Sequence, residues 1–520
     1  MAEPYYLTTA IAYPNGPPHI GHAYEAIAGD VIARVQRMNG RDVRFITGTD
    51  EHGLKMDKTA RDQGRATGDL ATEMSNLFRN MGEILNISYD GFVRTTELRH
   101  HAASIAIWKA MEAAGDLYLG RYEGWYSVRD EAFYGEDELV EGEGGEKLSP
   151  QGTPVEWTVE ETWFFRLSKY RDFLIELNET PGFLEPESRR NEVLSFLRAQ
   201  ELRDLSVSRT SFDWGVPVPG SPDHVMYVWV DALTTYLTGI GFPTREGEFE
   251  RFWPAQLHLI GKDIVRFHAV YWPAFLKSAG LPVPRTIFGH GFLLHRGAKM
   301  SKSLGNVVDP LELAKMFGVD ALRYFLLREV SFGQDGSFSA EAIVLRCNAE
   351  LSNSFGNLAQ RTLSQIFKNC DGVLPPILKQ TDDDLALFEA VQRAIAVEMP
   401  AYFEQLAFSQ ALESWMNAVF ACNAYIDAQA PWALKKTDFE RMRTVLATLY
   451  VCIAELAVAV SPVMPASMAK LLEAMGVAEH LRTTDGIQST WYSPLAEAHF
   501  RIEAPTGLFP RLELPEEAVA

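Results

Sequence analysis

Apolar runs alternate with helical spacing over the first 115 residues of the chain. Residues 5–12 and 43–47 are short and mostly apolar, which is typical of buried strands. Between them, apolar residues recur every three or four positions from about residue 19 to a stop at Gly40. The predicted apolar face of this helix consists of Ile20, Tyr24, Ile27, Val31 and Val35. The strand–helix–strand order predicts a doubly wound parallel sheet whose functional residues follow strand ends.

The pattern changes twice further along the chain. From about residue 116 to 220 it is irregular and rich in Gly, Pro and acidic residues, which predicts an inserted domain. Strand–helix order resumes at 225–236 and continues with a strand at 256–260, a helix at 264–276 and a last strand at 285–294. The remainder is helical in spacing almost to its end. We therefore expect an α/β protein with a Rossmann-type doubly wound parallel sheet, an inserted domain and an all-α C-terminal bundle.

Length and composition fit a large enzyme with several cores. With 520 residues and 47% hydrophobic content, three or four domains are expected. The start lacks a basic segment followed by an apolar one, so we expect no secretory signal and a cytoplasmic location. The apolar stretch 451–460 is interrupted by Glu455 and is too short to span a membrane, so no membrane contact is expected. The cysteines have no Cys-x-x-Cys spacing, which favours free buried thiols; they are Cys347, Cys370, Cys422 and Cys452.

The net charge excludes binding to nucleic acid through a strong basic field. The whole chain carries −21, and residues 341–520 contain 13 Lys+Arg against 22 Asp+Glu, a balance of −9. DNA is therefore not an expected partner, because non-specific affinity for a polyanion comes from positive charge. Any RNA contact must depend on individually placed side chains.

Two short motifs carry the candidate chemistry. Lys299-Met300-Ser301-Lys302-Ser303 places two cations and two hydroxyls within five residues, which suits a loop that wraps a polyphosphate. His19-Ile20-Gly21-His22 follows two prolines at an expected helix start, where two imidazoles lie beside unpaired backbone N–H groups. Alone, each motif also fits a blander interpretation, a solvated charged turn or an ordinary capped helix. Together they indicate adenylate transfer from ATP.

The chemistry of that reaction needs these residue types. When a substrate carboxylate attacks the α-phosphate, His19 and His22 can stabilise the added negative charge with fixed N–H donors at the positive end of a helix. Lys299 and Lys302 can neutralise the departing pyrophosphate. The substrate itself is the nucleophile, so the protein works through positioning and electrostatics.

Several segments in a fixed order resemble the methionyl-tRNA synthetases, a family of class I aminoacyl-tRNA synthetases. The matching segments are 12–16, 19–22, 47–53, 202–215, 227–236, 260–272, 299–303 and 427–434. The resemblance implies activation of L-methionine with ATP and Mg²⁺ to methionyl-adenylate and pyrophosphate. It also implies transfer of methionine to the 3′-terminal ribose of tRNA(Met), elongator and initiator. The chain ends at Ala520 without the extra module that makes some relatives dimeric, so a monomer is expected.

The resemblance also implies a domain plan. Residues 1–115 and 223–294 would form the two halves of the catalytic Rossmann domain, with 116–222 inserted between them as a connective-peptide domain. Residues 295–345 would hold the Lys-Met-Ser-Lys-Ser and stem-contact region. Residues 346–520 would form the helical anticodon-binding domain.

Site residues follow from the family motifs, position by position. The resemblance assigns ATP to His19, Gly21, His22, Glu25, Gly261, Asp263 and Lys302. It assigns methionine to Ile11, Ala12, Tyr13, Asp50, Trp229, Ala232, Leu233, Tyr236, Asp263, Phe267 and His268. In that assignment Asp50 binds the ammonium group, and Tyr236 and His268 donate to the sulfur. It assigns tRNA contacts to Arg209, Asn357, Arg361 and Trp432, the indole serving as a stacking platform for an unstacked base.

Several of these residues also have ordinary structural interpretations. Trp229 and Phe267 could be core aromatics and Trp432 a core residue of the bundle. Arg209 could form a surface ion pair, and Asp263 could cap the following helix. Asp50 could cap a loop, and Glu25 could simply pair with a cation.

The inserted domain departs from the family pattern at the zinc knuckle that many relatives carry. Ser127 and Asp130 stand at the first pair of cysteine positions, and Leu148 and Gln151 stand at the second pair. Structural zinc requires four Cys or His ligands. We therefore expect no metal site here and a knuckle that is held by packing.

Two other classes of function fit the motifs less well. A small nucleotidyltransferase with His-x-Gly-His would lack a bundle of this size, and synthetases for large aliphatic residues carry a far longer insertion than the about one hundred residues seen here. A non-catalytic tRNA-binding relative should have lost His19, His22 or Lys302, and all three are present.

Overall fold

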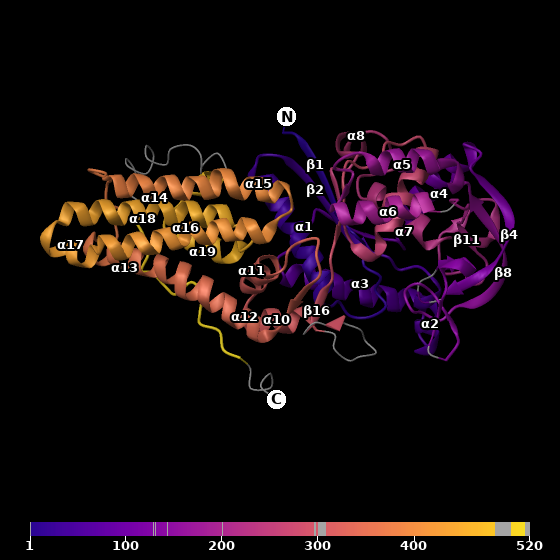
Figure 1. Ribbon diagram of the computed structural model, residues 1–520, viewed down its shortest axis with the longest axis horizontal. Coiled ribbons are helices and arrows are strands. Elements are labelled where there is room, and N and C mark those ends of the chain that lie inside the picture. Colours follow the sequence, from indigo (N-terminus) through magenta and orange to yellow (C-terminus); the bar gives the residue numbers. More distant parts are fainter. Residues whose placement is uncertain are drawn as a thin grey trace.

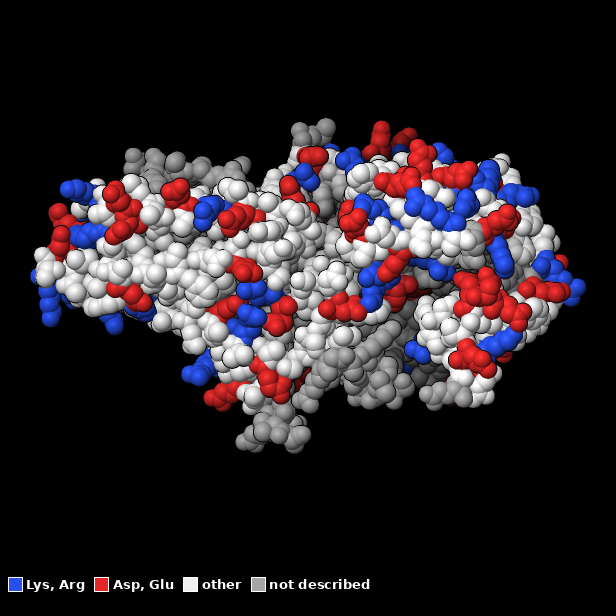
Figure 2. All heavy atoms as spheres, in the orientation of Figure 1, with Lys and Arg blue, Asp and Glu red and all other residues white. Residues whose placement is uncertain are grey.

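The computed structural model describes residues 2–127, 129, 132–142, 144–199, 201–295, 298–299, 308–483 and 501–514. The molecule is elongated, with a mixed α/β lobe at one end and a helical bundle at the other (Figure 1). Basic and acidic side chains are interspersed over the visible face (Figure 2). This distribution agrees with the absence of a broad basic field expected from the net charge of −21.

A parallel sheet forms the centre of the α/β lobe. Among the described residues, six strands pair in the order β3-β2-β1-β14-β15-β9. Their bounds are β1 Pro4–Thr9, β2 Asp42–Thr49, β3 Gly91–Arg94, β9 Leu184–Glu185, β14 Leu257–Gly261 and β15 Ile287–His290. Every pairing in this sheet is parallel. The predicted fold class is therefore confirmed.

Helix α1 (Ile20–Met38) connects β1 to β2 and covers one face of the sheet. All five residues of its predicted apolar face are buried. Gly29 lets the helix approach closely, because a Cβ there would lie 2.8 Å from Thr9 Cγ2. The other helices of the first half are α2 Leu54–Asp62, α3 Thr67–Ile84 and α4 Leu98–Ala113. The start of α1 thus lies at the carboxyl end of β1, where open α/β sheets place ligands.

The inserted region forms small antiparallel sheets of its own. One contains β10 Leu205–Ser206, β8 Glu156–Phe165, β4 Leu117–Ser127 and β5 Ala132–Tyr134, and another contains β11 Ser208–Arg209, β13 Ser221–Met226 and β12 Pro217–Val218. Strands β6 Val140–Glu141 and β7 Lys147–Leu148 form a third. The same region also supplies β9 to the main sheet, between helices α5 Arg171–Glu179 and α6 Glu187–Ala199. The insertion is therefore joined to the catalytic sheet by strand pairing as well as by the chain.

The return to the main sheet follows the expected order, with one difference. Helices α7 Val228–Thr238, α8 Glu248–Phe252 and α9 Trp272–Ser278 flank β14, with a 3₁₀ turn at Lys262–Ile264 and a π-helical turn at Phe267–Tyr271. The predicted strand at 285–294 is wrong as a single element, since β15 ends at His290. The chain then enters β16 Leu293–His295, which pairs with β17 Ala298–Lys299 and β18 Gly336–Phe338. Gly291 lies at the break because a Cβ there would come within 2.2 Å of the Gln334 backbone.

The C-terminal lobe is helical. Helices α10 Pro310–Phe317 and α11 Val319–Glu329 lead into it, followed by α12 Ala340–Cys347, α13 Asn357–Asn369, α14 Asp382–Gln392, α15 Met399–Glu404, α16 Phe408–Gln429, α17 Pro431–Thr437, α18 Phe439–Val460 and α19 Pro465–Ala474. Buried apolar residues form one continuous cluster from α1 through α11 into this bundle. The two lobes therefore share a core on this side of the sheet.

Helix α18 extends well beyond the apolar stretch at 451–460. It has 22 residues, and among the described helices it alone has the length and composition to cross a membrane. Within its most apolar window, 94% of the residues are buried inside the protein. Burial of this kind is expected for the central helix of a bundle.

Candidate active site

A cavity of about 460 Å³ opens at the carboxyl ends of the central strands. It brings together predicted residues that are far apart in the sequence, from the loop after β1, the start of α1, the loop after β2, α7 and the turn after β14. These are Ile11, Ala12, Tyr13, His19, Gly21, His22, Glu25, Asp50, Trp229, Gly261 and Asp263. The volume is within the usual range for a small-molecule site.

The two histidines of the predicted motif are held by the backbone at the start of α1. The backbone N–H of Gly21 donates to His19 Nδ1 over 3.1 Å, and the backbone N–H of His19 donates to His22 Nδ1 over 3.1 Å. The rings stack with centroids 3.7 Å apart. Because each Nδ1 accepts, the neutral rings carry their protons on Nε2. Gly21 favours this packing, since a Cβ would lie 3.0 Å from the His19 ring and push it aside.

Three consecutive polar residues after β2 have three different partners. Asp50 lines the cavity, and its backbone N–H donates to the carbonyl of Ala12 over 2.8 Å. Glu51 is fully buried and forms an ion pair with Arg94 at 2.6 Å. His52 Nδ1 lies 2.6 Å from Asp231 Oδ2. Asp50 therefore lies at the cavity wall in a loop whose neighbouring side chains are themselves fixed.

Asp231, which the sequence analysis missed, forms hydrogen bonds with two histidines from different elements. Its second oxygen lies 2.6 Å from His100 Nε2, so one buried carboxylate on α7 joins the loop after β2 to α4. Burial raises the pKa of Asp231, but His52 and His100 outweigh this effect and hold the pKa below its usual value. Asp231 is only two residues after Trp229, and this proximity to a predicted site residue was the available sequence signal. Its partners are more than one hundred residues away in the sequence.

An aromatic pair is found among the predicted methionine-pocket residues, several of which are buried away from the cavity wall. Trp229 and Phe267 stack with centroids 3.8 Å apart and planes at 7°. Both are half-buried, so they are not core aromatics. The described cavity wall does not include Phe267 or the four residues Ala232, Leu233, Tyr236 and His268.

Tyr236 and His268, the predicted donors to the methionine sulfur, form hydrogen bonds within the protein. His268 Nδ1 lies 2.9 Å from the carbonyl of Ile264 and must donate to it. Burial lowers the pKa of His268 to about 4, so the ring is neutral and its Nε2 accepts from the Tyr236 hydroxyl over 2.7 Å. Both protons are thereby engaged within the protein.

His290 is a further cavity residue that sequence reasoning missed. Its Nε2 lies 2.8 Å from Glu25 Oε2, one turn along α1 from His22. Burial raises the pKa of Glu25 more than His290 lowers it, while Glu25 outweighs burial and raises the pKa of His290. His290 ends β15, but the sequence predicted a strand that continued to residue 294, so its position at the strand end was not visible in the sequence.

The turn after β14 places Asp263 over Gly261. A Cβ at Gly261 would lie 2.7 Å from Asp263 Oδ1. The N-cap of this short helical turn is Gly261, so the capping interpretation of Asp263 is wrong. The neighbouring Lys262 forms an ion pair with Asp335 at 2.7 Å.

Arg209 lines a second cavity of about 460 Å³ between the insertion and the catalytic sheet. It is 3% exposed, which excludes a surface ion pair. Its Nη1 donates to Ser206 Oγ and to the carbonyl of Ser208, and its guanidinium lies 4.5 Å from the centre of the Tyr227 ring. Asp263 lines both cavities, whereas Phe267 lines the second and stacks on Trp229 of the first.

The predicted polyphosphate loop is only partly described. Lys299 pairs through its backbone with Leu294 in the small β16–β17 sheet. Lys302 lies outside the described residues.

A second group of predicted residues lies at the far end of the bundle, on α13 and α17. Trp432 is 48% exposed, which excludes a core role. The guanidinium of Arg361 lies 5.3 Å from the centre of the indole and forms an ion pair with Asp427 at 2.7 Å. Asn357 is exposed one turn before Arg361. Lys435 and Lys436 on α17 add local positive charge at this tip, the leftmost part of Figures 1 and 2.

Hydroxyl groups occupy the interior of the predicted knuckle. Ser127 Oγ lies 2.6 Å from Thr153 Oγ1, which lies 2.8 Å from Ser149 Oγ, and all three residues are buried. Leu148 is in β7 and Gln151 in the following turn, while Asp130 lies outside the described residues. Within the described part of the chain, no three His, Cys, Asp or Glu side chains are grouped to hold a metal.

Comparison with known proteins extends over nearly the whole chain. Residues 5–363 match the family model for tRNA synthetases class I (M), and residues 374–518 match that for the anticodon binding domain of methionyl tRNA ligase. The methionine–tRNA ligase of Brucella suis biovar 1 is 54% identical over 98% of each chain. That of Mycobacterium tuberculosis strain CDC 1551 is 53% identical over 99% of each chain.

Solved structures show the same similarity. Mycobacterium tuberculosis methionyl-tRNA synthetase in complex with methionyl-adenylate is 52% identical, with a TM-score of 0.94 over 98% of this chain and 100% of that one. The apo form of the same enzyme is 49% identical, with a TM-score of 0.88 over 99% of each chain.

Proposed function

Because the chain belongs to the methionyl-tRNA synthetase family, we propose that the cavity around His19, His22 and Asp50 is its methionine-activating site and that the bundle tip reads its tRNA. The chain is a methionine–tRNA ligase: it joins methionine to AMP from ATP and then transfers methionine to tRNA. Which residues perform each step is the subject of the proposal. The observation that carries it is the convergence of both histidines, Asp50 and Asp263 on one cavity.

In the activation step, the methionine carboxylate attacks the α-phosphorus of ATP and pyrophosphate leaves. The Nε2–H groups of His19 and His22 would donate to phosphate oxygens as charge accumulates. Their orientation is fixed by the backbone N–H donors to each Nδ1, so little reorganisation is needed during the reaction. The start of α1 adds the positive end of a helix dipole. Lys299 and Lys302 would neutralise the leaving pyrophosphate.

Methionine would be oriented at its two ends. Asp50 would supply a carboxylate for the ammonium group from the cavity wall, on a loop that the partners of Glu51 and His52 hold in place. The thioether would reach Ala232, Leu233, Tyr236 and His268 when the stacked rings of Trp229 and Phe267 separate. Since the protons of Tyr236 and His268 are engaged, recognition of the sulfur would rest on aromatic contact and apolar fit.

ATP would lie between the start of α1 and the turn after β14. Gly21 and Gly261 leave room for close approach, while Glu25 and Asp263 offer carboxylates to ribose hydroxyls. Mg²⁺ would enter with ATP, held mainly by phosphate oxygens, since the described residues hold no three-carboxylate cage. Its chemistry is to screen the phosphate charge.

Transfer requires that one tRNA reach both lobes. Arg209 at the second cavity would contact the acceptor end, and Asn357, Arg361 and Trp432 would read unstacked anticodon bases at the bundle tip. The domain plan with boundaries at 115, 222, 294 and 345 is part of this proposal. We also propose that the enzyme is monomeric and cytoplasmic, and that it has neither structural zinc nor contact with a membrane.

The direct test is methionine-dependent exchange of pyrophosphate into ATP, measured with each amino acid in turn. Asp50→Asn should raise the KM for methionine strongly, because it removes the counter-charge of the ammonium group. Lys302→Ala should lower kcat far more than it changes the KM for methionine. An Asp50→Asn variant with an unchanged KM would contradict the assignment of the cavity.

A further inference from the structure

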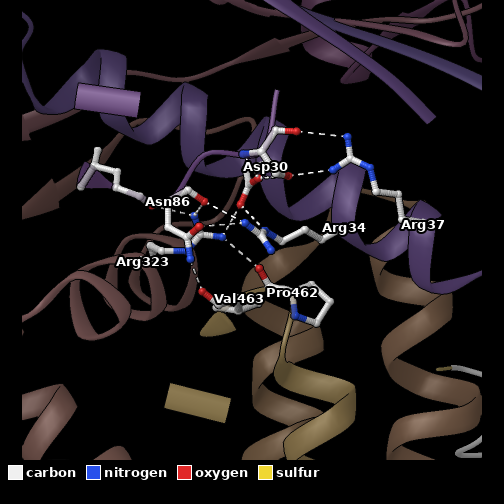
Figure 3. A network of polar contacts seen from close by, with 9 residues as sticks. Asp30, Arg34, Arg37, Asn86, Arg323, Pro462 and Val463 are labelled. Atoms are coloured by element: carbon white, nitrogen blue, oxygen red, sulfur yellow. Dashed lines mark hydrogen bonds and ion pairs between the residues drawn. The ribbon is translucent and has the colours of Figure 1, made fainter. Parts of the chain in front are cut away.

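The guanidinium of Arg323 joins three segments that are remote in sequence (Figure 3). Arg323 lies on α11 and is fully buried. Its Nη2 donates to Asp30 Oδ2 over 2.6 Å and to the carbonyl of Pro462 over 2.9 Å. Its Nε donates to the carbonyl of Val463 over 2.8 Å, and Nη1 donates to that of Leu85 over 3.1 Å. A planar fork with five N–H groups is the side chain that suits such divergent acceptors.

Each partner of Arg323 belongs to an element with its own part in the molecule. Asp30 is on α1, two turns after His22. Leu85 is the C-cap of α3, and Phe78 of that helix packs edge-on against the His22 ring at 5.0 Å. Pro462 and Val463 follow α18, the long helix whose opposite end begins beside α17. One cation therefore connects the helix of the catalytic histidines, the helix that supports them and the helix that leads to the bundle tip.

Asp30 has other partners that keep α1 in place without Arg323. Arg34 Nε donates to Asp30 Oδ2 over 2.7 Å, and the backbone N–H and hydroxyl of Ser88 donate to Oδ1 over 2.6 Å. Burial raises the pKa of Asp30, but Arg323 and Arg34 outweigh it and lower the pKa. Helix α1 is also packed on the sheet through its buried apolar face. The Pro462 and Val463 carbonyls accept hydrogen bonds from Arg323, and through it they are connected to Asp30 in the catalytic lobe.

The geometry of α18 makes this junction sensitive. At 1.5 Å per residue, its 22 residues span about 33 Å, so a tilt of about 10° at the Pro462 end would move the other end by about 6 Å. That displacement exceeds the spacing of stacked aromatic rings. Ion pairs buried in this way contribute little net stability compared with apolar packing, so a geometric role is the better physical reason for the charge.

We infer that Arg323 is a positioning residue that fixes the direction of the bundle relative to α1, so that a tRNA held at the bundle tip presents its acceptor end to the active site. This inference rests on the proposed reading of tRNA at Trp432 and Arg361. It adds no catalytic contact: Arg323 touches neither cavity.

The test compares two variants with a matched control on the same helix. Arg323→Met removes the guanidinium and its hydrogen bonds but keeps a side chain of similar length. Arg323→Lys keeps the positive charge, but one ammonium group cannot reach all three segments. Arg328→Met is the control, because Arg328 is also an ion-paired arginine of α11, half-buried, yet its partners Glu350, Ser409 and Glu413 all belong to the bundle. Thermal unfolding of each variant establishes that it is folded.

Both Arg323 variants should lower kcat/KM for full-length tRNA by about tenfold while methionine-dependent pyrophosphate exchange stays within about twofold of the native rate. Charging of an acceptor-stem minihelix, which does not reach the bundle tip, should be unchanged. Single-molecule FRET between dyes at exposed Glu112 on α4 and Lys436 on α17 should show a broader distribution of distances. Arg328→Met should change none of these.

Proportional loss of exchange and charging, or equal loss on tRNA and minihelix, would overturn the inference, as would an unchanged FRET distribution. The FRET measurement contains no tRNA, so it separates failure of the junction from failure of the anticodon assignment. If the FRET distances broaden but the ratio of kcat/KM for tRNA to that for the minihelix stays at the native value, the junction acts as inferred. In that case the assignment of tRNA reading to the bundle tip is wrong.

Discussion

Two tryptophans illustrate how the two lobes of this enzyme are built for different tasks. Trp229 is half-buried and stacked on Phe267 beside the cavity, where the imidazoles of His19, His22 and His290 are held by hydrogen bonds. Trp432 is 48% exposed at the end of the bundle, with Arg361 beside its face. Chemistry on a phosphate needs donors that are held in place and shielded from water. Reading an unstacked base needs an aromatic face that is open to solvent.

The two lobes also differ in where they place their polar and ionisable residues. Polar residues that meet at the catalytic lobe's functional edge include Asp231 with His52 and His100, and Glu25 with His290. The bundle places its ionisable groups mostly at its surface. On its long central helix α18, Glu455 is the one charged residue after Arg443, and it is buried. The comparison predicts that substitutions in the catalytic lobe damage both reactions, whereas those at the bundle tip damage only the reaction with tRNA.

The largest expected effect follows from removing a donor at the active site. His22→Ala should lower both pyrophosphate exchange and tRNA charging by about 10²–10³-fold, because both require the adenylate. His22→Asn is the matched variant: its amide oxygen can replace Nδ1 as acceptor for the His19 N–H but leaves no donor at Nε2. It should be nearly as inactive as the alanine variant. Recovery of activity in His22→Asn would assign His22 a capping role only.

Trp432→Ala should have a smaller and more selective effect. Loss of one stacking platform costs about 1–3 kcal/mol, which corresponds to roughly one to two decades in tRNA affinity. Exchange should be unchanged, and Trp432→Phe should restore much of the charging. If exchange falls as far as charging, the tip supports the fold instead of reading tRNA, and the comparison fails.

A pH effect distinguishes the interior of the bundle. Burial raises the pKa of Glu455 to about 8, far above that of the unfolded chain, so the folded state holds a proton that the unfolded state releases. The free energy of unfolding should therefore fall as pH rises from about 5 to 8, by up to about 1.4 kcal/mol per pH unit from this group. Urea unfolding of Glu455→Gln should show a flatter dependence on pH. An identical slope in both proteins would mean that Glu455 is ionised in the folded state.

The smallest effect is expected from zinc. The hydroxyls of Ser127, Thr153 and Ser149 occupy the knuckle interior. Chelation followed by return of Mg²⁺ alone should restore full activity, and metal analysis should find well under one zinc per chain. Activity that returns only with zinc would contradict this account of the insertion.

The fold could be predicted from the sequence where local patterns dominate. The apolar period of α1 and the long helical spacing of the bundle both correspond to elements in the structure. Strand β9 could not be predicted, because two residues are too few to show a period. The strand at 285–294 was predicted as one element because the break at Gly291 depends on contact with Gln334, which is distant in the sequence.

The candidate site divides in the same way. Motifs pointed to His19, His22 and Asp50, which do meet in one cavity. Asp231 and His290 were missed, because their roles depend on partners more than one hundred residues away. The direction of the bond between Tyr236 and His268 could not be read from sequence either, since it is set by the Ile264 carbonyl, which engages the His268 proton.

The division between the lobes is tested most directly by single-turnover transfer from preformed methionyl-adenylate on native and Trp432→Ala enzyme, measured over a range of tRNA concentrations. We predict that Trp432→Ala shifts the half-saturating tRNA concentration upward by one to two decades, while the transfer rate at saturation equals the native rate. A reduced rate at saturation with unchanged half-saturation would show that Trp432 acts on the chemistry, and it would contradict the separation of the two tasks.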